Sequence, residues 1–127
     1  MIAADSSVLI AWLKGEAMSP GISERFQQAL RTHRLILPPV VVAELSSATL
    51  LPKVQADLIR DLATLPIIDA YWERAGRLRA DVSRQGFKAR LGDVLVAQAC
   101  IDAATPLLAQ DRDFRHFETF GLTLFAS

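Results

Sequence analysis

Four acidic side chains occupy positions in the sequence where a carboxylate can take part in chemistry. Asp5 follows an apolar run, Glu44 interrupts a second, Asp93 opens a third, and Asp111 follows a fourth by two residues. A carboxylate beside a buried apolar segment is costly unless another charge neutralises it. Carboxylate oxygens are hard ligands of the kind that Mg²⁺ and Mn²⁺ prefer. A divalent ion held by them can activate water and stabilise charge on a phosphodiester, so these residues indicate a metal site and phosphate chemistry.

Convergence of the four carboxylates would be unfavourable without a cation. Two carboxylates about 4 Å apart repel by roughly 4 kcal/mol at an effective dielectric constant near 20. The net stability of a whole domain is only about 5–15 kcal/mol. A cluster of this kind therefore predicts a function that needs it.

Taken singly, most of these acids also have a purely structural explanation. Asp5 can cap the helix that follows it, and Asp93, directly after Gly92, can serve only as a favourable acid in a first helical turn. Asp111 and Asp113 are both candidates to cap the last helical segment. Glu44 is harder to explain in this way, because it interrupts an apolar stretch, residues 40–45, in which no solvated face is obvious.

Short apolar runs alternate with helical segments along the chain, and this alternation predicts how the acids are positioned. Strands are expected at residues 2–4, 35–37, 67–68 and 106–109, with a further candidate at 122–125. Helices are expected at about 6–14, 22–32, 40–50, 52–65, 70–85, 93–103 and 113–120. The pattern indicates an α/β fold of three layers, with a central, mostly parallel sheet of four to five strands and helices on both faces. We expect residues 1–127 to form a single domain.

This topology predicts that the acids meet at one edge of the sheet. Ligands of open parallel sheets bind outside the carboxyl ends of the strands. Asp5 and Asp111 each come just after an expected strand, Glu44 lies in the helix after another, and Asp93 opens a helix that leads into the fourth.

Composition excludes several other classes of protein. The 14 basic and 14 acidic residues cancel, which argues against binding duplex nucleic acid by bulk charge. No apolar run reaches the roughly 18 residues of a membrane span, and the start of the chain has an early acid and no basic region, unlike a signal peptide. We therefore expect a cytoplasmic protein. The single cysteine, Cys100, lies in an apolar helical run and is interpreted as a core thiol.

A basic segment leads into Asp93. Residues 74–90 carry six basic side chains against one acid, Asp81, a local charge of +5. The segment is either a rim that contacts RNA phosphates or an ordinary solvated face, and Lys88 and Arg90, in the loop nearest Asp93, are the best candidates for substrate contact. His33 and His116 have no partner at metal-ligand spacing. The two tryptophans, at positions 12 and 72, are interpreted as core or subunit contacts.

Four segments together resemble a known family, the PIN-domain ribonucleases, and the chain length resembles that of VapC-type toxins of bacterial toxin–antitoxin pairs. The segments, in the family's order from end to end of the chain, are Ile2–Ile10, Pro39–Leu45, Gly92–Gln98 and Pro106–Phe114. The resemblance implies a PIN-like fold. It also implies a homodimer and a cognate antitoxin whose C-terminal segment blocks the site.

The resemblance also implies roles for particular residues. The acidic quartet Asp5, Glu44, Asp93 and Asp111 would bind Mg²⁺ or Mn²⁺ and catalyse the hydrolysis of RNA, with Ser6 as the hydroxyl beside the first acid. Asp113 is the alternative fourth ligand. Two positions depart from the family: Ala109 stands where a Thr is often found, and Ser7 where an Asn is often found.

Other functions stay open at the level of sequence. A phosphoryl-aspartate hydrolase would need an acid where Ser7 stands. The alternative to an endoribonuclease is a catalytically silent PIN-like or receiver-like interaction domain. Asp69 can imitate the phosphorylated residue of a receiver, but no suitable Lys follows Pro106. For a protein partner, the expected docking surface consists of the apolar helix Val8–Leu13 and the apolar face of Ile22–Leu30.

Overall fold

The central element is a five-stranded parallel sheet, and all five strands are short. The computed structural model describes residues 1–47 and 52–126. Within it the strands are β1 (Ile2–Ala4), β2 (Leu35–Leu37), β3 (Ala63–Thr64), β4 (Leu107–Ala109) and β5 (Leu124–Ala126). Their order is β3-β2-β1-β4-β5, and every pair is parallel. The central strands are almost wholly apolar because both of their faces are covered.

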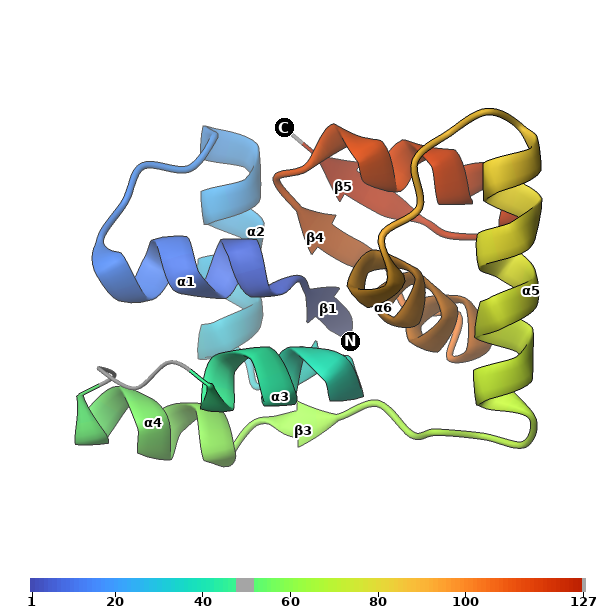
Figure 1. The fold of residues 1–127 in the computed structure, drawn as a ribbon. Coiled ribbons are helices and arrows are strands. Elements are labelled where there is room, and N and C mark those ends of the chain that lie inside the picture. The colour runs from blue at the N-terminus through green and yellow to red at the C-terminus, as the bar shows by residue number, and fades with distance from the viewer. Residues whose placement is uncertain (48–51, 127) are drawn as a thin grey trace.

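Six α-helices and one 3₁₀ helix surround the sheet in the described residues (Figure 1). They are α1 (Ser6–Lys14), α2 (Pro20–Arg31), α3 (Pro39–Ser46), α4 (Lys53–Arg60), α5 (Tyr71–Arg84), α6 (Leu91–Asp102) and the 3₁₀ helix η1 (Arg112–Phe120). Helix α2 packs against β2 and β4 from behind in the view of Figure 1, whereas α3 contacts α1 and α6 in front. The expected three-layer α/β fold is therefore confirmed. None of the described helices is both long and apolar enough to cross a bilayer.

The third strand is the main error in the predicted elements. It forms at Ala63–Thr64, where β3 pairs with Ile36 and Leu37 of β2, and not at residues 67–68. The helix expected to run to residue 65 ends at Arg60. Ile67 and Ile68 are 49% and 46% exposed. These two consecutive β-branched residues therefore lie in a connecting segment and not in a strand. The end of the helix expected at 40–50 falls partly on residues 48–51, outside the described residues.

Apolar side chains from every layer form one continuous core. Ala3, Ala4, Leu107 and Leu108 of the central strands have no exposed surface. Cys100 is buried as expected, and burial raises the pKa of its thiol to about 12.

The two tryptophans differ from each other in their surroundings. Trp12 packs on Phe26, with ring centroids 5.4 Å apart. Trp72 is 61% exposed, so its interpretation as a core residue is wrong, and its alternative role as a subunit contact stays a prediction.

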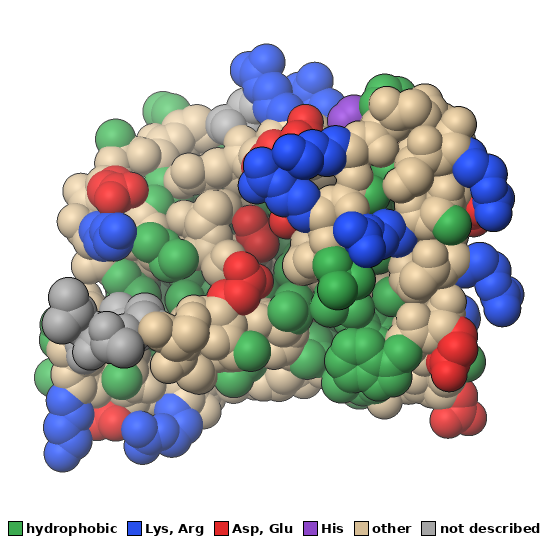
Figure 2. All heavy atoms as spheres, in the orientation of Figure 1, with side chains coloured by type: hydrophobic (Ala, Val, Ile, Leu, Met, Phe, Trp, Pro, Cys, Tyr) green, Lys and Arg blue, Asp and Glu red, His purple; other side chains and the backbone are tan. Residues whose placement is uncertain are grey.

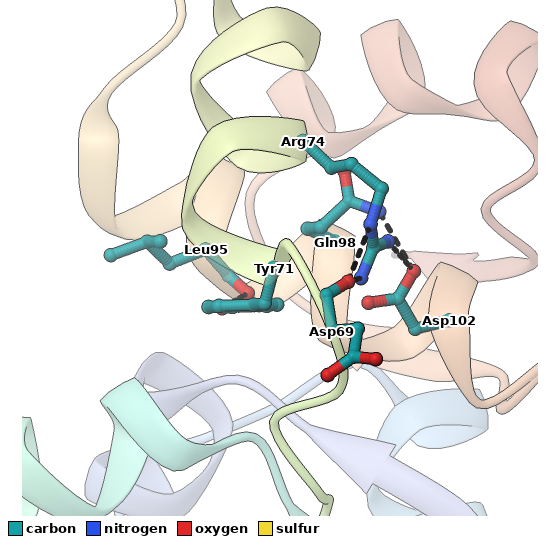
Figure 3. Close-up of polar contacts among 6 residues, drawn as sticks. All are labelled: Asp69, Tyr71, Arg74, Leu95, Gln98 and Asp102. Atoms are coloured by element: carbon teal, nitrogen blue, oxygen red, sulfur yellow. Dashed lines mark hydrogen bonds and ion pairs between the residues drawn. The ribbon is translucent and has the colours of Figure 1, made fainter.

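A set of polar contacts fastens α5 to α6 (Figure 3). The Tyr71 hydroxyl donates to the carbonyl oxygen of Leu95 over 2.6 Å. Arg74 donates to the Asp69 carbonyl oxygen and forms an ion pair with Asp102, which also accepts from the Gln98 amide over 2.9 Å. These contacts fix the helix that carries Asp93.

Removing the Tyr71 hydroxyl should destabilise this junction. Tyr71 is only 2% exposed, so Tyr71→Phe loses a buried hydrogen bond while it keeps the packed ring. We expect the free energy of unfolding to fall by about 1 kcal/mol, measured by urea denaturation. The matched control is Ser83→Ala, which removes an exposed hydroxyl from the same helix and should change stability by no more than about 0.5 kcal/mol. Equal stability of Tyr71→Phe and wild type would show that the contact does not hold the helices together.

Candidate active site

The pairing of β1 with β4 brings Asp5 and the segment that carries Asp111 to one edge of the sheet. Ala4 is in register with Leu108, and the Asp5 backbone N–H donates to the Leu108 carbonyl oxygen over 3.0 Å. Asp5 is the N-cap residue of α1, and Asp111 is the N-cap residue of η1. Both therefore lie at the carboxyl ends of adjacent strands, as the sequence predicted.

The other two acids reach this edge from helices. Glu44 lies in α3, which begins directly after β2, and Asp93 lies in the first turn of α6. Asp5 is 7% exposed and Asp93 is half-buried, but Glu44 and Asp111 are exposed. The expectation that Glu44 lacks a solvated face is wrong, because α3 turns Val41 and Leu45 to the core and leaves the side with Glu44 open.

Two serine hydroxyls hold two of the carboxylates. Ser6 Oγ donates to Glu44 Oε2 over 3.1 Å, which ties α1 to α3, and Ser7 Oγ donates to Asp5 Oδ2 over 3.0 Å. The sequence singled out Ser6 as the hydroxyl beside Asp5, whereas the structure gives that contact to Ser7. Ser6 and Ser7 both lie in the first turn of α1, so their positions in the sequence did not show which hydroxyl contacts Asp5.

The fourth acid has a capping role that its alternative does not share. Asp111 Oδ1 accepts a hydrogen bond of 2.9 Å from the Asp113 backbone N–H, which caps η1. The Asp113 carboxylate is exposed and faces His116, with Oδ1 and Nε2 3.8 Å apart. The charge of Asp111 raises the pKa values of both Asp5 and Asp93. We call the edge of the sheet that carries Asp5, Glu44, Asp93 and Asp111 the acidic rim.

Burial and neighbouring charges raise the pKa values of Asp5, Glu44 and Asp93. Burial raises the pKa of Asp93 to about 6, and repulsion from Asp5 and then Asp111 adds to the rise, while Arg90 opposes it. The pKa of Asp5 is raised mainly by burial, against the hydrogen bond from Ser7, with a further rise from Asp111. Partial desolvation and the charge of Asp5 raise the pKa of Glu44, against the Ser6 hydroxyl. Perturbed carboxylates gathered at one edge are typical of functional sites.

The chemistry of this acidic rim fits a divalent cation, although the side chains do not form a finished ligand shell. Within residues 1–47 and 52–126, no three His, Cys, Asp or Glu side chains lie close enough to hold one metal ion. The donor set is nonetheless all carboxylate oxygen, as Mg²⁺ and Mn²⁺ prefer. Repulsion between the acids adds to the effect of burial on the pKa values of Asp5, Glu44 and Asp93, and a bound cation would relieve that repulsion.

Lys88 and Arg90 lie in the loop between α5 and α6, beside this rim. Arg90 is the N-cap residue of α6 and lowers the pKa of Asp93, while the Lys88 side chain is exposed. Figure 2 shows acidic side chains in and beside a hollow at the centre of one face, with Lys and Arg side chains gathered next to them. Two other arginines of the basic segment are engaged in ion pairs, Arg74 with Asp102 and Arg84 with Asp81.

Two contacts that the sequence did not signal fix this loop. Arg79 Nε donates to the carbonyl oxygen of Ala89 over 2.9 Å. The Phe87 ring lies on His116, with centroids 4.0 Å apart and planes inclined by 36°. His116 therefore contacts the loop, and the sequence separation of the pair gives no hint of this contact.

The raised pKa of Asp93 makes a pH-dependent contribution to stability. Its folded-state pKa of about 6 lies above the ordinary value of 3.8, so the folded protein binds the proton more tightly than the unfolded chain. The stabilisation is full below pH 3.8 and is lost as the pH rises through about 6. In EDTA at neutral pH, Asp93→Asn should therefore be more stable than wild type by about 1 kcal/mol, after allowance for solvent screening of a half-buried group.

Urea denaturation at pH 4 and at pH 7, in EDTA, measures this difference. The advantage of Asp93→Asn should be present at the higher pH and shrink at the lower one. The matched control is Asp57→Asn, which removes an exposed acid from α4 and should show no such advantage. A variant less stable than wild type at both pH values would mean that Asp93 acts as a helix-start residue only.

Known proteins resemble this chain in sequence and in fold. The chain is 27% identical over 114 residues to "Ribonuclease VapC5" of Mycobacterium tuberculosis, a match that covers 87% of this chain and 82% of that protein. Among solved structures, VapBC2 of Rickettsia felis bound to a promoter DNA fragment has a TM-score of 0.77 at 15% identity, covering 100% of this chain and 99% of the other. VapBC-5 of M. tuberculosis has a TM-score of 0.67 at 24% identity, covering 98% and 95%.

The structural likenesses, at these identities, establish a shared fold. The family itself is identified by a match of sequence. The family model of the PIN domain matches residues 2–119, nearly the whole chain. The chain belongs to the PIN domain family.

Proposed function

We propose that this chain is a metal-dependent endoribonuclease whose residues 1–127 form a single nuclease domain. The observation that carries the proposal is the rim at the carboxyl ends of β1 and β4. Four acids from different segments gather there, and burial together with mutual repulsion raises the pKa values of Asp5, Glu44 and Asp93. Asp5, Glu44, Asp93 and Asp111 are the proposed catalytic and metal-binding residues, and Mg²⁺ or Mn²⁺ is the proposed ion. Membership of the PIN family and the similarity to a ribonuclease support RNA as the substrate.

Each part of the site has a distinct task in this proposal. A bound divalent ion would lower the pKa of a water molecule and stabilise charge on the phosphodiester. One carboxylate of the rim accepts the proton of the attacking water. The Ser6 and Ser7 hydroxyls hold the Glu44 and Asp5 carboxylates in place. Lys88 and Arg90 offset the phosphate charge of the RNA as it approaches an otherwise acidic surface.

We further propose that the protein is the toxin of a toxin–antitoxin pair and forms a homodimer. The similar structures include a member of "the VapBC family of toxin-antitoxin systems". The expected docking surface for an antitoxin needs one correction: Ile22, Phe26 and Ala29 of α2 face the core, so that face is not free. On α1, Trp12 and Leu13 are only partly buried and stay available for a partner.

Cleavage of RNA is the direct test of the catalytic proposal. Purified protein should cut single-stranded RNA with Mg²⁺ or Mn²⁺ and stop in EDTA. Asp5→Asn, Glu44→Gln and Asp93→Asn should each lower the rate by about 100-fold or more, because each removes charge from the site that stabilises the transition state. Asp57→Asn, at an exposed acid of α4 outside the rim, serves as the matched control and should cut like wild type.

The cleavage assay also discriminates between Asp111 and Asp113 as the fourth acid, and a melting experiment tests the binding of the metal ion. Asp111→Asn should lose far more activity than Asp113→Asn. Mn²⁺ should raise the melting temperature of wild type more than that of Asp93→Asn, since the ion binds only the folded protein. Undiminished cutting in EDTA, or by Asp93→Asn, would rule out the metal-dependent mechanism. Absence of cutting by wild type with Mg²⁺ or Mn²⁺ would instead leave a catalytically silent interaction domain.

Growth measurements test the toxin proposal separately. Expression of wild type alone should arrest growth in the native host, and co-expression of its antitoxin should restore it. Asp93→Asn should be harmless yet still copurify with the antitoxin, because the proposed docking surface on α1 is intact. Harmless expression of wild type, together with the absence of any copurifying partner, would contradict this part of the proposal and leave the nuclease activity unaffected.

A further inference from the structure

A cavity of about 560 Å³ lies at the edge of the sheet opposite the acidic rim. Its wall is formed by one face of α2 with Arg25, Gln28, Ala29 and Thr32, together with the start of β1 and Arg34. Arg34 directly precedes β2, and Ile2 begins β1, so the cavity lies at the amino ends of these parallel strands. It is therefore separate from the site built around Asp5.

The two arginines of this cavity are rooted in fixed parts of the structure. The Arg25 guanidinium lies over the Phe125 ring, 4.1 Å from its centroid. The Arg34 backbone N–H donates to the Ala29 carbonyl oxygen over 2.8 Å, and its carbonyl oxygen accepts from the Ile2 N–H over 2.8 Å. The turn that delivers Arg34 contains His33 at φ 55°, a conformation that costs a non-glycine residue energy. The fold thus holds the Arg25 side chain by its ring contact and the Arg34 backbone by hydrogen bonds, and both arginines are exposed to solvent.

No carboxylate of the described residues compensates the charge of the cavity. None of the residues that line it is acidic, and neither Arg25 nor Arg34 forms an ion pair with any carboxylate in residues 1–47 and 52–126. The Thr32 hydroxyl already donates to the Gln28 carbonyl oxygen over 2.8 Å, which leaves the guanidinium groups and the Gln28 amide as the free donors. Two unpaired guanidinium groups in one hollow favour an anion.

We propose that this cavity binds the phosphate of a nucleotide. Guanidinium groups match phosphate oxygens with paired hydrogen bonds. The volume lies within the roughly 300–1,000 Å³ of small-molecule sites, far more than a phosphate alone needs. Met1, which is 56% exposed, and Ile2 supply apolar surface for a base. The phosphate belongs either to a free mononucleotide or to a nucleotide of an RNA strand. The inference does not rest on the proposed nuclease activity.

Titrations followed by amide NMR in EDTA test the site on the whole protein. AMP should produce saturable shifts concentrated in residues 25–34. Arg25→Gln and Arg34→Gln should each weaken AMP binding by about tenfold, the usual effect of losing one charge-assisted contact. Arg31→Gln is the matched control, because this exposed arginine lies on the same helix but does not line the cavity. Its affinity for AMP should equal that of wild type.

A second titration with a short single-stranded RNA identifies the source of the phosphate. Shifts at residues 25–34 that AMP reverses by competition would assign the site to an RNA strand, whereas AMP binding without an RNA response would assign it to a free nucleotide. The proposal is overturned if neither ligand gives saturable shifts there, or if Arg31→Gln weakens binding as much as Arg34→Gln. It is also overturned if sodium chloride at the same ionic strength reproduces the response.

Discussion

The adjacency of β1 and β4 is the constraint on which the acidic rim depends. Strand order reverses at β1: the chain first moves outward to β2 and β3, then returns to the other side of β1 as β4. The carboxyl ends of β1 and β4 consequently open side by side, which is where parallel sheets place their ligand sites. Asp5 and Asp111 are the first polar groups beyond these ends to carry negative charge. A different strand order would separate them, even with the same residues in the same local conformations.

Helix packing brings the other two acids, Glu44 and Asp93, to the acidic rim. Glu44 reaches the rim because α3 packs against α1, and the Ser6–Glu44 hydrogen bond fixes that contact at its most polar point. Asp93 reaches it because α6 is fastened along its length to α5 by Tyr71 and by the pair of Arg74 with Asp102. Repulsion within the rim favours separation of the acids, so stable packing away from the rim must hold the helices against it. Stability and function are here in opposition, as is common at active sites.

The sequence predicted those parts of the structure that depend on strong local patterns. The runs 2–4, 35–37 and 107–109 are apolar because central strands are covered on both faces. An acidic residue that ends or follows such an apolar run is therefore easy to recognise in the sequence. The position of β3 was not predictable in this way. An edge strand of two exposed residues, Ala63 and Thr64, carries no hydrophobic signal, whereas Ile67 and Ile68 carry a strong one without pairing. Contacts such as Ser7 with Asp5 depend on how α1 is rotated, which no single-residue property specifies.

The net charge of zero conceals a separation of charge between the two ends of the strands. At the carboxyl ends, Asp5 and its neighbours create a region that repels phosphate unless a cation is bound and basic residues such as Arg90 assist. At the amino ends, Arg25 and Arg34 stand in a cavity without any acidic residue. Summed composition excludes binding by bulk charge but says nothing of such local fields, which act within about 10 Å at moderate salt. The parallel sheet provides the separation, because all strands begin at one edge and end at the other.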